Sequence, residues 1–530
     1  MIDIDTIIIG AGPAGLQLGY FLQKGNHEYL ILERNEKAAS FFSKYPHTGK
    51  LISINKKYTG RDDPEFNLRH DWNSLLCDDP TFRFTSYSDD YYPDHKDLVR
   101  YLNDFAEKYK LNIKYNTAVN NVQKENHTGK YHLTCGETYY MCNKLIIATG
   151  LSKPAMPFVH EEVSEKIKHY AEFEPGYFQK DETLEKFKNK SLAIIGSGNS
   201  AYELANHLMP YCSTIIIYSR SNKDLSMSTN YTGDLRALYL PFKESFLLKS
   251  LNAEGELNPK ILSIFQESED SKYILKQKCS NITCSYLHKI IPEISGFDKV
   301  IYCTGWSFDD SIFSFNVNVT ANKKYPNISD IYESQNNKNL FFIGSLMHNK
   351  DYKKSSGGFI HGFRYLIEHF YKILYVKEQI ITKFNKDNIS ELRNHIIYRI
   401  NNISSIYQMH GIIGDIFYLS DESLTILYHP SISVNNAYSI VRPSYNYYFI
   451  LMLEFGKDKV TDYYKLGKRI SNIGTESKST LLHPTICILN KDKNIIDFIH
   501  FDEDILANFT DKQRYSDKLD RVLQLLLSEP

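Results

Sequence analysis

Tryptophan, cysteine and unbalanced charge are all scarce in this sequence. The 530 residues hold two tryptophans and eight cysteines, and the formal net charge is -1. The cysteines show no zinc-type pairing, and only Cys279 and Cys284 have a spacing seen in redox-active disulfides, for which chance is the simpler account. We therefore expect a reduced, cytosolic chain. The balanced charge gives no electrostatic footprint for nucleic acid or for an acidic membrane surface.

Long apolar segments are missing as well. The densest apolar run, Phe449–Leu453, is far shorter than the roughly 18–20 residues of a membrane span. The chain opens on MIDIDTIII, which has the pattern of a strand and not that of a signal peptide with a basic region and a cleavage site. We expect a cytoplasmic protein with no membrane segment. At roughly 100–200 residues per domain, the length predicts about three domains.

The first ordered motif is a strand, a glycine-rich turn and a helix at the N-terminus. The strand Thr6–Ile9 runs into the turn Gly10–Gly15 (GAGPAG), the helix Leu16–Gln23 follows, and Tyr29–Leu32 is the next strand. The first glycine makes the turn, the second admits a pyrophosphate and the third lets helix and strand pack closely. An acid at the end of the second strand is placed to bind a ribose. The residues expected to bind this dinucleotide are Gly10, Gly12, Pro13, Ala14, Gly15, Glu33 and Arg34.

A second unit of the same kind starts at Ser191–Ile195. Its turn Gly196–Ser200 opens the helix Ala201–Met209, and the next strand, Thr214–Tyr218, ends at Ser219 and Arg220 instead of at an acid. An arginine at this place can pair with a 2′-phosphate, so the pattern favours NADPH, with NADH as the alternative cofactor. The alternative role for Arg220 is that of an ordinary solvated surface arginine. The expected cofactor contacts are Gly196, Gly198, Asn199, Ser200, Ser219 and Arg220.

The remaining pattern predicts an α/β fold with two Rossmann-like, three-layer dinucleotide-binding domains and an appended C-terminal α+β domain. Buried strands at Lys144–Ile147, Lys299–Tyr302 and Leu340–Ile343 each run into a glycine, and His95–Tyr109 and Gly358–Tyr371 are expected helices. We expect an FAD-binding domain in two parts, an NADPH-binding domain between them and the C-terminal domain, over residues 1–155 with 305–375, 156–304 and 376–530.

The sequence GAGPAG followed by LER resembles the FAD site of the large flavoprotein oxidoreductase group. In that group the FAD is enclosed by turns that match Ala148, Thr149, Gly150 and Gly344, although Ser345 stands where many members have an aspartate. A second Thr-Gly turn ends at Gly305. Two nucleotide sites and two Thr-Gly turns resemble the class B flavin monooxygenases. Their fingerprint FxGxxxHxxxW/Y is matched only in part by Val163–Phe173, where His169 fits but Val163 and Glu165 depart.

A more specific resemblance is to the FAD-dependent oxidoreductase domain-containing 2 family, whose eukaryotic members include the endoplasmic reticulum flavoprotein associated with degradation. The blocks that carry it are KLISINK at Lys50–Lys56, FNLRHDWNSLL at Phe66–Leu76, YTGDLRA at Tyr231–Ala237, LKSL at Leu248–Leu251, KSSGGFIHGFRY at Lys354–Tyr365, IYQMHGIIGD at Ile406–Asp415 and LLHPTI at Leu481–Ile486. With no signal peptide and an LLLSEP end, the chain is expected to be a cytosolic, bacterial relative.

The resemblance to class B monooxygenases implies a chemistry. NADPH would reduce FAD, O₂ would add at C4a of the reduced flavin, and the hydroperoxide would pass one oxygen to a substrate. The asparagine-containing segment SINKK makes Asn55 the first choice to hydrogen-bond that adduct, with a turn asparagine as the alternative. Trp72 and Asn73 are expected ring or ribityl contacts, although Trp72 also suits plain core packing.

Two further groups of residues are expected near the flavin. Asp234 and Arg236 would lie on the nicotinamide side, with a local salt bridge as the alternative. Ser356, Gly357 and Gly358 would form a helix N-terminus that faces the flavin, surrounded by His348, His361 and Arg364. No metal cluster and no pairing of nucleophile and base is visible in the sequence.

Three functions follow from these expectations. The first is an NADPH-dependent FAD monooxygenase that uses O₂ on a small molecule, at nitrogen, sulfur or an electron-rich aromatic ring such as indole. The second is an NADPH-dependent flavin reductase or oxidase, including a disulfide reductase that would use Cys279 and Cys284. The third is a flavin-stabilised binding protein with residues 376–530 as the partner module. The sequence leaves open whether the chain forms a homodimer.

Overall fold

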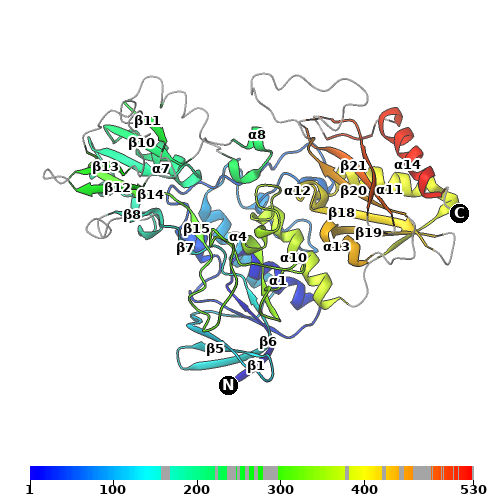
Figure 1. Cartoon of the computed structure of the whole chain (residues 1–530), viewed down its shortest axis with the longest axis horizontal. Coiled ribbons are helices and arrows are strands. Elements are labelled where there is room, and N and C mark those ends of the chain that lie inside the picture. The colour runs from blue at the N-terminus through cyan, green and yellow to red at the C-terminus, as the bar shows by residue number, and fades with distance from the viewer. Residues whose placement is uncertain are drawn as a thin grey trace.

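Three β-sheets organise the chain, as the computed structural model in Figure 1 shows. The structure describes residues 1–156, 167–220, 225–235, 246, 251–256, 262–267, 272–278, 296–376, 381–420, 425–440, 447–456, 479, 481–490, 492, 494–504, 507–510 and 512–527. Arg236, Val163, Glu165, Cys279 and Cys284 lie outside the described residues.

The first sheet has a parallel core and an antiparallel edge. Its strand order is β3-β2-β1-β6-β5-β4, with β16 also paired to β6. The strands are β1 (Ile2–Ile9), β2 (Tyr29–Leu32), β3 (Ile113–Lys114), β4 (Asn121–Lys124), β5 (Tyr131–Cys135), β6 (Thr138–Ile147) and β16 (Leu340–Phe342). Strands β1, β2, β3, β6 and β16 run parallel, so their carboxyl ends meet at one edge of the sheet. Ligands of such sheets bind at that edge.

The second sheet is parallel throughout, in the order β11-β10-β9-β14-β8. Its strands are β8 (Lys168–His169), β9 (Ser191–Ile195), β10 (Thr214–Ser219), β11 (Ala253–Glu256) and β14 (Lys299–Tyr302). A hairpin, β12 (Leu262–Glu267) with β13 (Tyr273–Lys278), lies close to it in Figure 1. The short strands β7 (Lys153–Pro154) and β15 (Trp306–Ser307) pair antiparallel, which joins the two chain segments that connect the first and second sheets.

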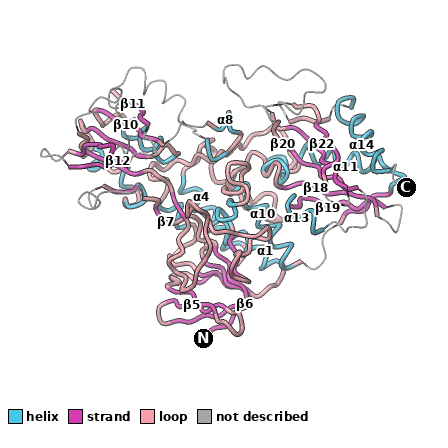
Figure 2. Tube along the Cα trace, viewed as in Figure 1, coloured by secondary structure: helices cyan, strands magenta, loops and turns pink. Residues whose placement is uncertain are grey.

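The third sheet is antiparallel, in the order β17-β19-β18-β20-β21-β22. Its strands are β17 (Thr382–Asn385), β18 (Ile413–Leu419), β19 (Thr425–Ser433), β20 (Tyr447–Glu454), β21 (His483–Asn490) and β22 (Ile495–His500). The helices near it in Figure 2 are α11 (Ile389–Asn402), α13 (Val434–Ile440) and α14 (Asp517–Leu527). Helix α12 (Ser404–Gln408) precedes β18.

Helices connect the first sheet to the third. Helix α1 (Pro13–Lys24) packs against α10 (Ile360–Tyr375), where Phe21 stacks on Tyr371 at 5.5 Å between ring centroids. Helix α4 (His95–Lys108) packs beside α1, while α2 (Ser40–Lys44) and α3 (Pro64–Leu68) belong to the long connection that follows β2. One hydrophobic core runs from the first sheet through α10 into the third sheet, whereas the second sheet has cores of its own. The third sheet is therefore built onto the first.

The predicted fold class is confirmed: the protein is α/β, with two parallel dinucleotide-type sheets and an additional sheet. Small differences concern the ends of helices, where α10 begins at Ile360 instead of Gly358 because Phe359 takes the N-cap position. Over the described ranges, none of the helices has the length and apolar character needed to cross a membrane. Within the same ranges, His, Cys, Asp and Glu side chains form no group suited to a metal ion.

Candidate active site

The first glycine turn has the geometry of a dinucleotide site. At Gly10 φ is +107°, and an added Cβ would lie 2.9 Å from the Ala148 carbonyl oxygen. At Gly15 an added Cβ would lie 2.0 Å from the Gly10 carbonyl oxygen, so helix α1 can approach strand β1 only without a side chain there. Gly12 is the N-cap of α1, and no side chain caps the helix. The first N–H groups of α1 are therefore left for a ligand.

Glu33 ties this turn to the end of β2. Its Oε2 accepts a hydrogen bond from the Ala11 N–H at 2.8 Å, and its Oε1 accepts from the backbone and side chain of Asn35 at 3.0 and 2.8 Å. A carboxylate offers about four acceptor positions, so one on Oε2 stays open to a ribose hydroxyl. Arg34, the next residue, is exposed.

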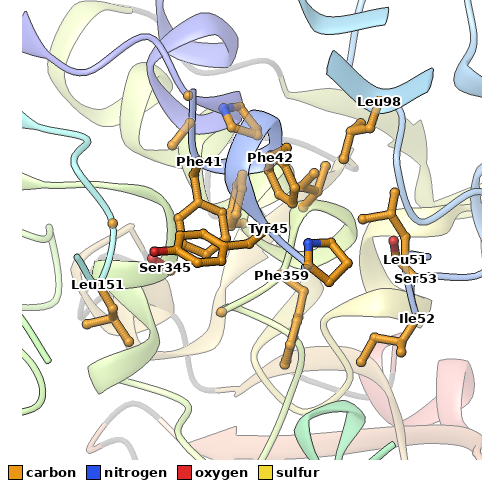
Figure 3. Close-up of a pocket in the computed structure, with 18 of the residues that line it drawn as sticks. Phe41, Phe42, Tyr45, Leu51, Ile52, Ser53, Leu98, Leu151, Ser345 and Phe359 are labelled. Atoms are coloured by element: carbon orange, nitrogen blue, oxygen red, sulfur yellow. The ribbon is translucent and has the colours of Figure 1, made fainter. Parts of the chain in front are cut away.

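A cavity of about 480 Å³ opens where the carboxyl ends of the parallel strands converge. Turns after β1, β6 and β16 reach it together, so segments far apart in the sequence share one wall. The predicted cofactor residues that line it are Gly12, Pro13, Ala14, Trp72, Ala148, Thr149, Gly150, Ser200 and Gly358. Ser345, which stands in place of the aspartate of many flavoproteins, also lines it (Figure 3).

The other predicted residues lie behind this lining or away from it. The described ones that do not line the cavity are Gly10, Gly15, Glu33, Arg34, Asn55, Asn73, Gly196, Gly198, Asn199, Ser219, Arg220, Asp234, Gly305, Gly344, Ser356 and Gly357. Gly344 packs directly against a lining residue: its φ is +73°, and an added Cβ there would lie 2.5 Å from the Cβ of Ala14.

An aromatic wall of this cavity was missed by the sequence reasoning. Figure 3 shows Phe41, Phe42 and Tyr45, from α2 and the residue after it, on one side of the cavity. Trp306 extends this wall, with ring centroids 5.0 Å from Tyr45 and 5.8 Å from Phe41. Tyr170 completes it. The cluster SFFSKYP in the long loop was a usable signal, but the approach of Trp306 depends on how the two sheets pack.

Asn55 and Asn73 both hold backbone instead of facing the cavity. The Asn55 side-chain amide donates to the carbonyls of Ser88 and Asp90 at 2.8 and 3.2 Å, which uses both of its hydrogens. Asn73 accepts from the Ser53 hydroxyl at 2.6 Å and donates to the Ser53 carbonyl at 3.3 Å. Ser53 lines the cavity and Asn73 does not, so Asn73 holds a lining residue in position through these two hydrogen bonds. The geometry favours structural roles for both asparagines.

Trp72 reaches the cavity from a segment that Arg364 holds in place. The indole stacks on His361 with ring centroids 4.3 Å apart. Arg364, fully buried on α10, donates to the carbonyls of Leu68, Asp71 and Ser74 at 2.7, 3.1 and 2.7 Å. Helix α10 thereby fixes the backbone on either side of Trp72.

The second glycine turn repeats the first. At Gly196 φ is +116°, and an added Cβ would lie 2.2 Å from the Cys303 carbonyl oxygen. Gly198 is the N-cap of α7 (Asn199–Leu208), again with no side-chain cap. Arg220 is exposed directly after β10, beside the buried Ser219. Because Ser200 of α7 lines the cavity, the N-termini of α1 and α7 both face it.

Glu203, one turn further along α7, also lines the cavity and was not predicted. Burial raises the pKa of its carboxyl to about 8. An unfolded glutamate titrates near pH 4.3. Between roughly pH 4.5 and 8 the folded protein therefore holds a proton that the unfolded chain has lost, and the free energy of unfolding falls as the pH rises through this window.

Replacing Glu203 by glutamine removes that loss. We expect Glu203→Gln to be more stable than the parent at pH 8 by about 1–3 kcal/mol, and the two proteins to converge near pH 4.5. Urea unfolding at a series of pH values measures the difference. Glu182→Gln, at an exposed glutamate, is the matched control and should follow the parent. Parallel pH dependences of parent and Glu203→Gln would contradict the raised pKa of this carboxyl.

The segment after β10 is joined to the start of α10 by buried polar contacts. The Tyr231 hydroxyl and Nε2 of His348 are 2.7 Å apart, and Nδ1 of His348 is 2.8 Å from Oδ1 of Asp351. Oδ2 of Asp351 accepts the N–H of Gly357 at 2.7 Å. Thr232 and Ser356 share a hydroxyl contact at 2.9 Å. Asp234 is buried in the same segment.

Comparison with known proteins places this geometry in a family. Residues 7–344 match the model of the pyridine nucleotide-disulphide oxidoreductase family. The FAD-dependent oxidoreductase domain-containing protein 2 of Mus musculus is 34% identical over 510 residues, covering 91% of this chain and 75% of the mouse protein. The chain belongs to this family of FAD-dependent oxidoreductases. As a member of it, the protein is a flavoenzyme, and the predicted family is confirmed.

Two more distant comparisons bear on the fold and the wider class. A probable indole-3-pyruvate monooxygenase of Arabidopsis thaliana is 26% identical over 216 residues, covering 38% of this chain and 44% of the plant protein. The solved structure of an FAD-bound cadaverine monooxygenase from Erwinia amylovora has a TM-score of 0.51 at 14% identity, covering 71% of this chain and 96% of that one. The latter likeness shows the fold.

The residues at the first glycine turn fit FAD. Gly12 has open space where a Cβ would be, the uncapped N-terminus of α1 is ready for a pyrophosphate, and Glu33 keeps an acceptor for a ribose. The largely apolar lining of the cavity suits the flat isoalloxazine ring.

Proposed function

We propose that this protein is an NADPH-dependent FAD monooxygenase acting on a small molecule. In the overall reaction NADPH, a proton, O₂ and the substrate give NADP⁺, water and the substrate with one added oxygen atom. Bound FAD would supply the redox chemistry, taking a hydride from NADPH and passing electrons to O₂. The observation that carries the proposal is that Ala14 of the first nucleotide helix and Ser200 of the second line the same cavity.

The exposed Arg220 supports NADPH as the reductant. It follows β10 at the place where NADH sites carry an acid, beside Ser219. A guanidinium there would pair with the 2′-phosphate. At the first site the same place is occupied by Glu33, which suits an unphosphorylated ribose. The two sites therefore differ in the sense expected for FAD and NADPH.

Replacing Arg220 by a neutral residue should weaken NADPH binding. We expect Arg220→Gln to raise the KM for NADPH about tenfold or more, because hydrogen bonds to charged groups contribute roughly 1.5–3 kcal/mol, and to leave the KM for NADH unchanged. Steady-state kinetics with both nucleotides measures the change. Arg100→Gln, at an exposed arginine on α4 paired with Asp97, controls for loss of a surface charge. An unchanged NADPH preference in Arg220→Gln would contradict the role.

The wall made by Phe41, Tyr45, Tyr170 and Trp306 supports a planar, weakly polar substrate. Aromatic side chains favour stacked or edge-on contact with flat rings. The substrate class proposed is a small molecule oxygenated at nitrogen, sulfur or an electron-rich aromatic ring such as indole, in keeping with the names of the plant and Erwinia relatives.

The deciding experiment measures where the oxygen goes. Purified holoenzyme is given NADPH, ¹⁸O₂ and a panel of indoles, amines and thioethers, and NADPH use, peroxide and labelled product are followed together. A monooxygenase shows an acceptor that raises NADPH oxidation and takes one ¹⁸O atom per NADPH. NADPH oxidation that no acceptor changes, with all the oxygen recovered as peroxide, would reject the proposal.

A disulfide reductase is the second candidate, because the matched family model carries that description. The described cysteines, Cys77, Cys135, Cys142, Cys212, Cys303 and Cys487, do not line the cavity. A reductase of this kind needs a dithiol beside the flavin, so the described part of the chain favours oxygen as the electron acceptor. Unchanged turnover in Cys279→Ser would remove the remaining pair from consideration.

A further inference from the structure

His361 is a buried polar side chain in the lining of the cavity. It is the second residue of α10, its exposed fraction is 1%, and it is part of the cavity lining. Within the described part of the chain neither ring nitrogen has a hydrogen-bond partner. The ring stacks on two others, on Trp72 at 4.3 Å and on Phe359 at 5.8 Å between centroids. Its orientation is therefore set by packing, while its polar atoms are unused.

The imidazole is held in its neutral form. Burial first, and then the positive charges of Arg364 and His410, keep the pKa of His361 well below its ordinary value. A neutral imidazole offers one N–H donor and one acceptor nitrogen. Leaving a buried polar group without a partner costs roughly 1–3 kcal/mol, so proteins seldom do it unless a ligand supplies the partner.

The start of α10 adds a second preference at the same wall. Gly358, Phe359 and Ile360 line the cavity with His361, and no side chain caps this 16-residue helix. A helix N-terminus carries partial positive charge and favours electronegative atoms. The imidazole N–H and the N-terminus of α10 therefore both favour a hydrogen-bond acceptor on the ligand.

One edge of the isoalloxazine ring of FAD carries such acceptors. The pyrimidine edge of the isoalloxazine carries carbonyl oxygens and ring nitrogens, and the opposite edge carries only methyl groups. We propose that His361 hydrogen-bonds the pyrimidine edge of the flavin, so that it both orients the ring in the cavity and stabilises the negative charge that this edge gains on reduction. The inference requires only the flavin of the family and stands whether the enzyme is a monooxygenase or a reductase.

The test is the redox preference and spectrum of bound flavin in His361→Phe, which keeps an aromatic ring against Trp72 and Phe359 but removes the donor. We expect about a tenfold loss of preference for reduced over oxidised flavin, which for a two-electron couple is a midpoint potential lower by about 30 mV. The visible absorption band of the oxidised flavin should also shift. His361→Gln, which restores an amide donor, should recover most of both properties.

Two further variants make the result decisive. His369→Phe removes another buried histidine from α10, one that does not line the cavity, and should leave potential and spectrum as in the parent. Should His361→Phe fail to fold, His361→Ala removes the donor together with the ring, and the same shifts in potential and spectrum, absent from His361→Gln, are expected. Loss of FAD from either variant, with apoprotein as stable as parent apoprotein, supports the contact. Full FAD content with an unchanged potential and spectrum in His361→Phe would overturn it, whatever the oxygenation assay gives.

Discussion

Replacing Gly12 by alanine is expected to weaken FAD binding about 10- to 100-fold without destabilising the folded apoprotein. The backbone at Gly12 is extended, with φ of -76° and ψ of -179°, which any residue adopts. An added Cβ would meet nothing within 4 Å. The fold itself therefore does not need a glycine here. What needs the space is a pyrophosphate resting on the start of α1, and the methyl group would push it away.

The second turn provides a matched comparison. Gly198 has the same extended backbone and the same open space, so Gly198→Ala should raise the KM for NADPH and leave FAD binding intact. Gly15→Ala should instead weaken the apoprotein, because its Cβ would lie 2.0 Å from the Gly10 carbonyl oxygen. Flavin-fluorescence titration and urea unfolding of the three apoproteins separate these effects. If Gly12→Ala kept its FAD affinity, or lost as much stability as Gly15→Ala, the assignment of the first site would be wrong.

The parts of the site that could be predicted are those written in contiguous residues. Gly10–Gly15 and Gly196–Ser200 combine backbone conformation, close packing and an exposed helix N-terminus within a few positions, so spacing alone indicates them. The strands before Gly150 and Gly344 are short apolar runs, and parallel strands must bring their ends to one edge. That is why Ala148, Thr149 and Gly150 reach the cavity, as the resemblance to flavoproteins implied, whereas Gly344 lies just behind it.

The parts that could not be predicted depend on contacts between distant segments. Asn55 looks like a ligand-facing amide in sequence, but the fold brings the carbonyls of Ser88 and Asp90 to it. Glu203 looks like an ordinary helix carboxylate in the sequence, but the fold places it, half-buried, in the cavity lining. The sequence indicates His361 only as one histidine near a helix start, because its stacking on Trp72 joins residues that are far apart in the sequence.

The second large effect is expected at Arg364. Arg364→Met would leave three buried carbonyl oxygens, those of Leu68, Asp71 and Ser74, without their donor. We expect the free energy of unfolding to fall by about 3–5 kcal/mol and FAD to be held less tightly, because Trp72 lies in the released segment. Arg364→Lys should recover little, since one ammonium cannot span three carbonyls. Urea unfolding measures the loss, with Arg100→Met as the exposed control; a change below about 1 kcal/mol would contradict the role.

A second buried arginine, Arg69, joins the same segment to helix α11 and the residue that follows it. Arg69 donates to the carbonyls of Ile400 and Ile403 at 2.9 and 3.2 Å, and its own carbonyl accepts from Gln408 at 2.5 Å. Arg69 and Arg364 thus hold the same short segment from two directions. In a double-mutant cycle, Arg69→Met and Arg364→Met should be non-additive, because either loss already frees the backbone around Trp72. Additive losses in the free energy of unfolding would indicate that the third sheet and the flavin site are energetically independent. Non-additive losses would indicate that the third sheet helps to fix the segment around Trp72, which lines the cavity.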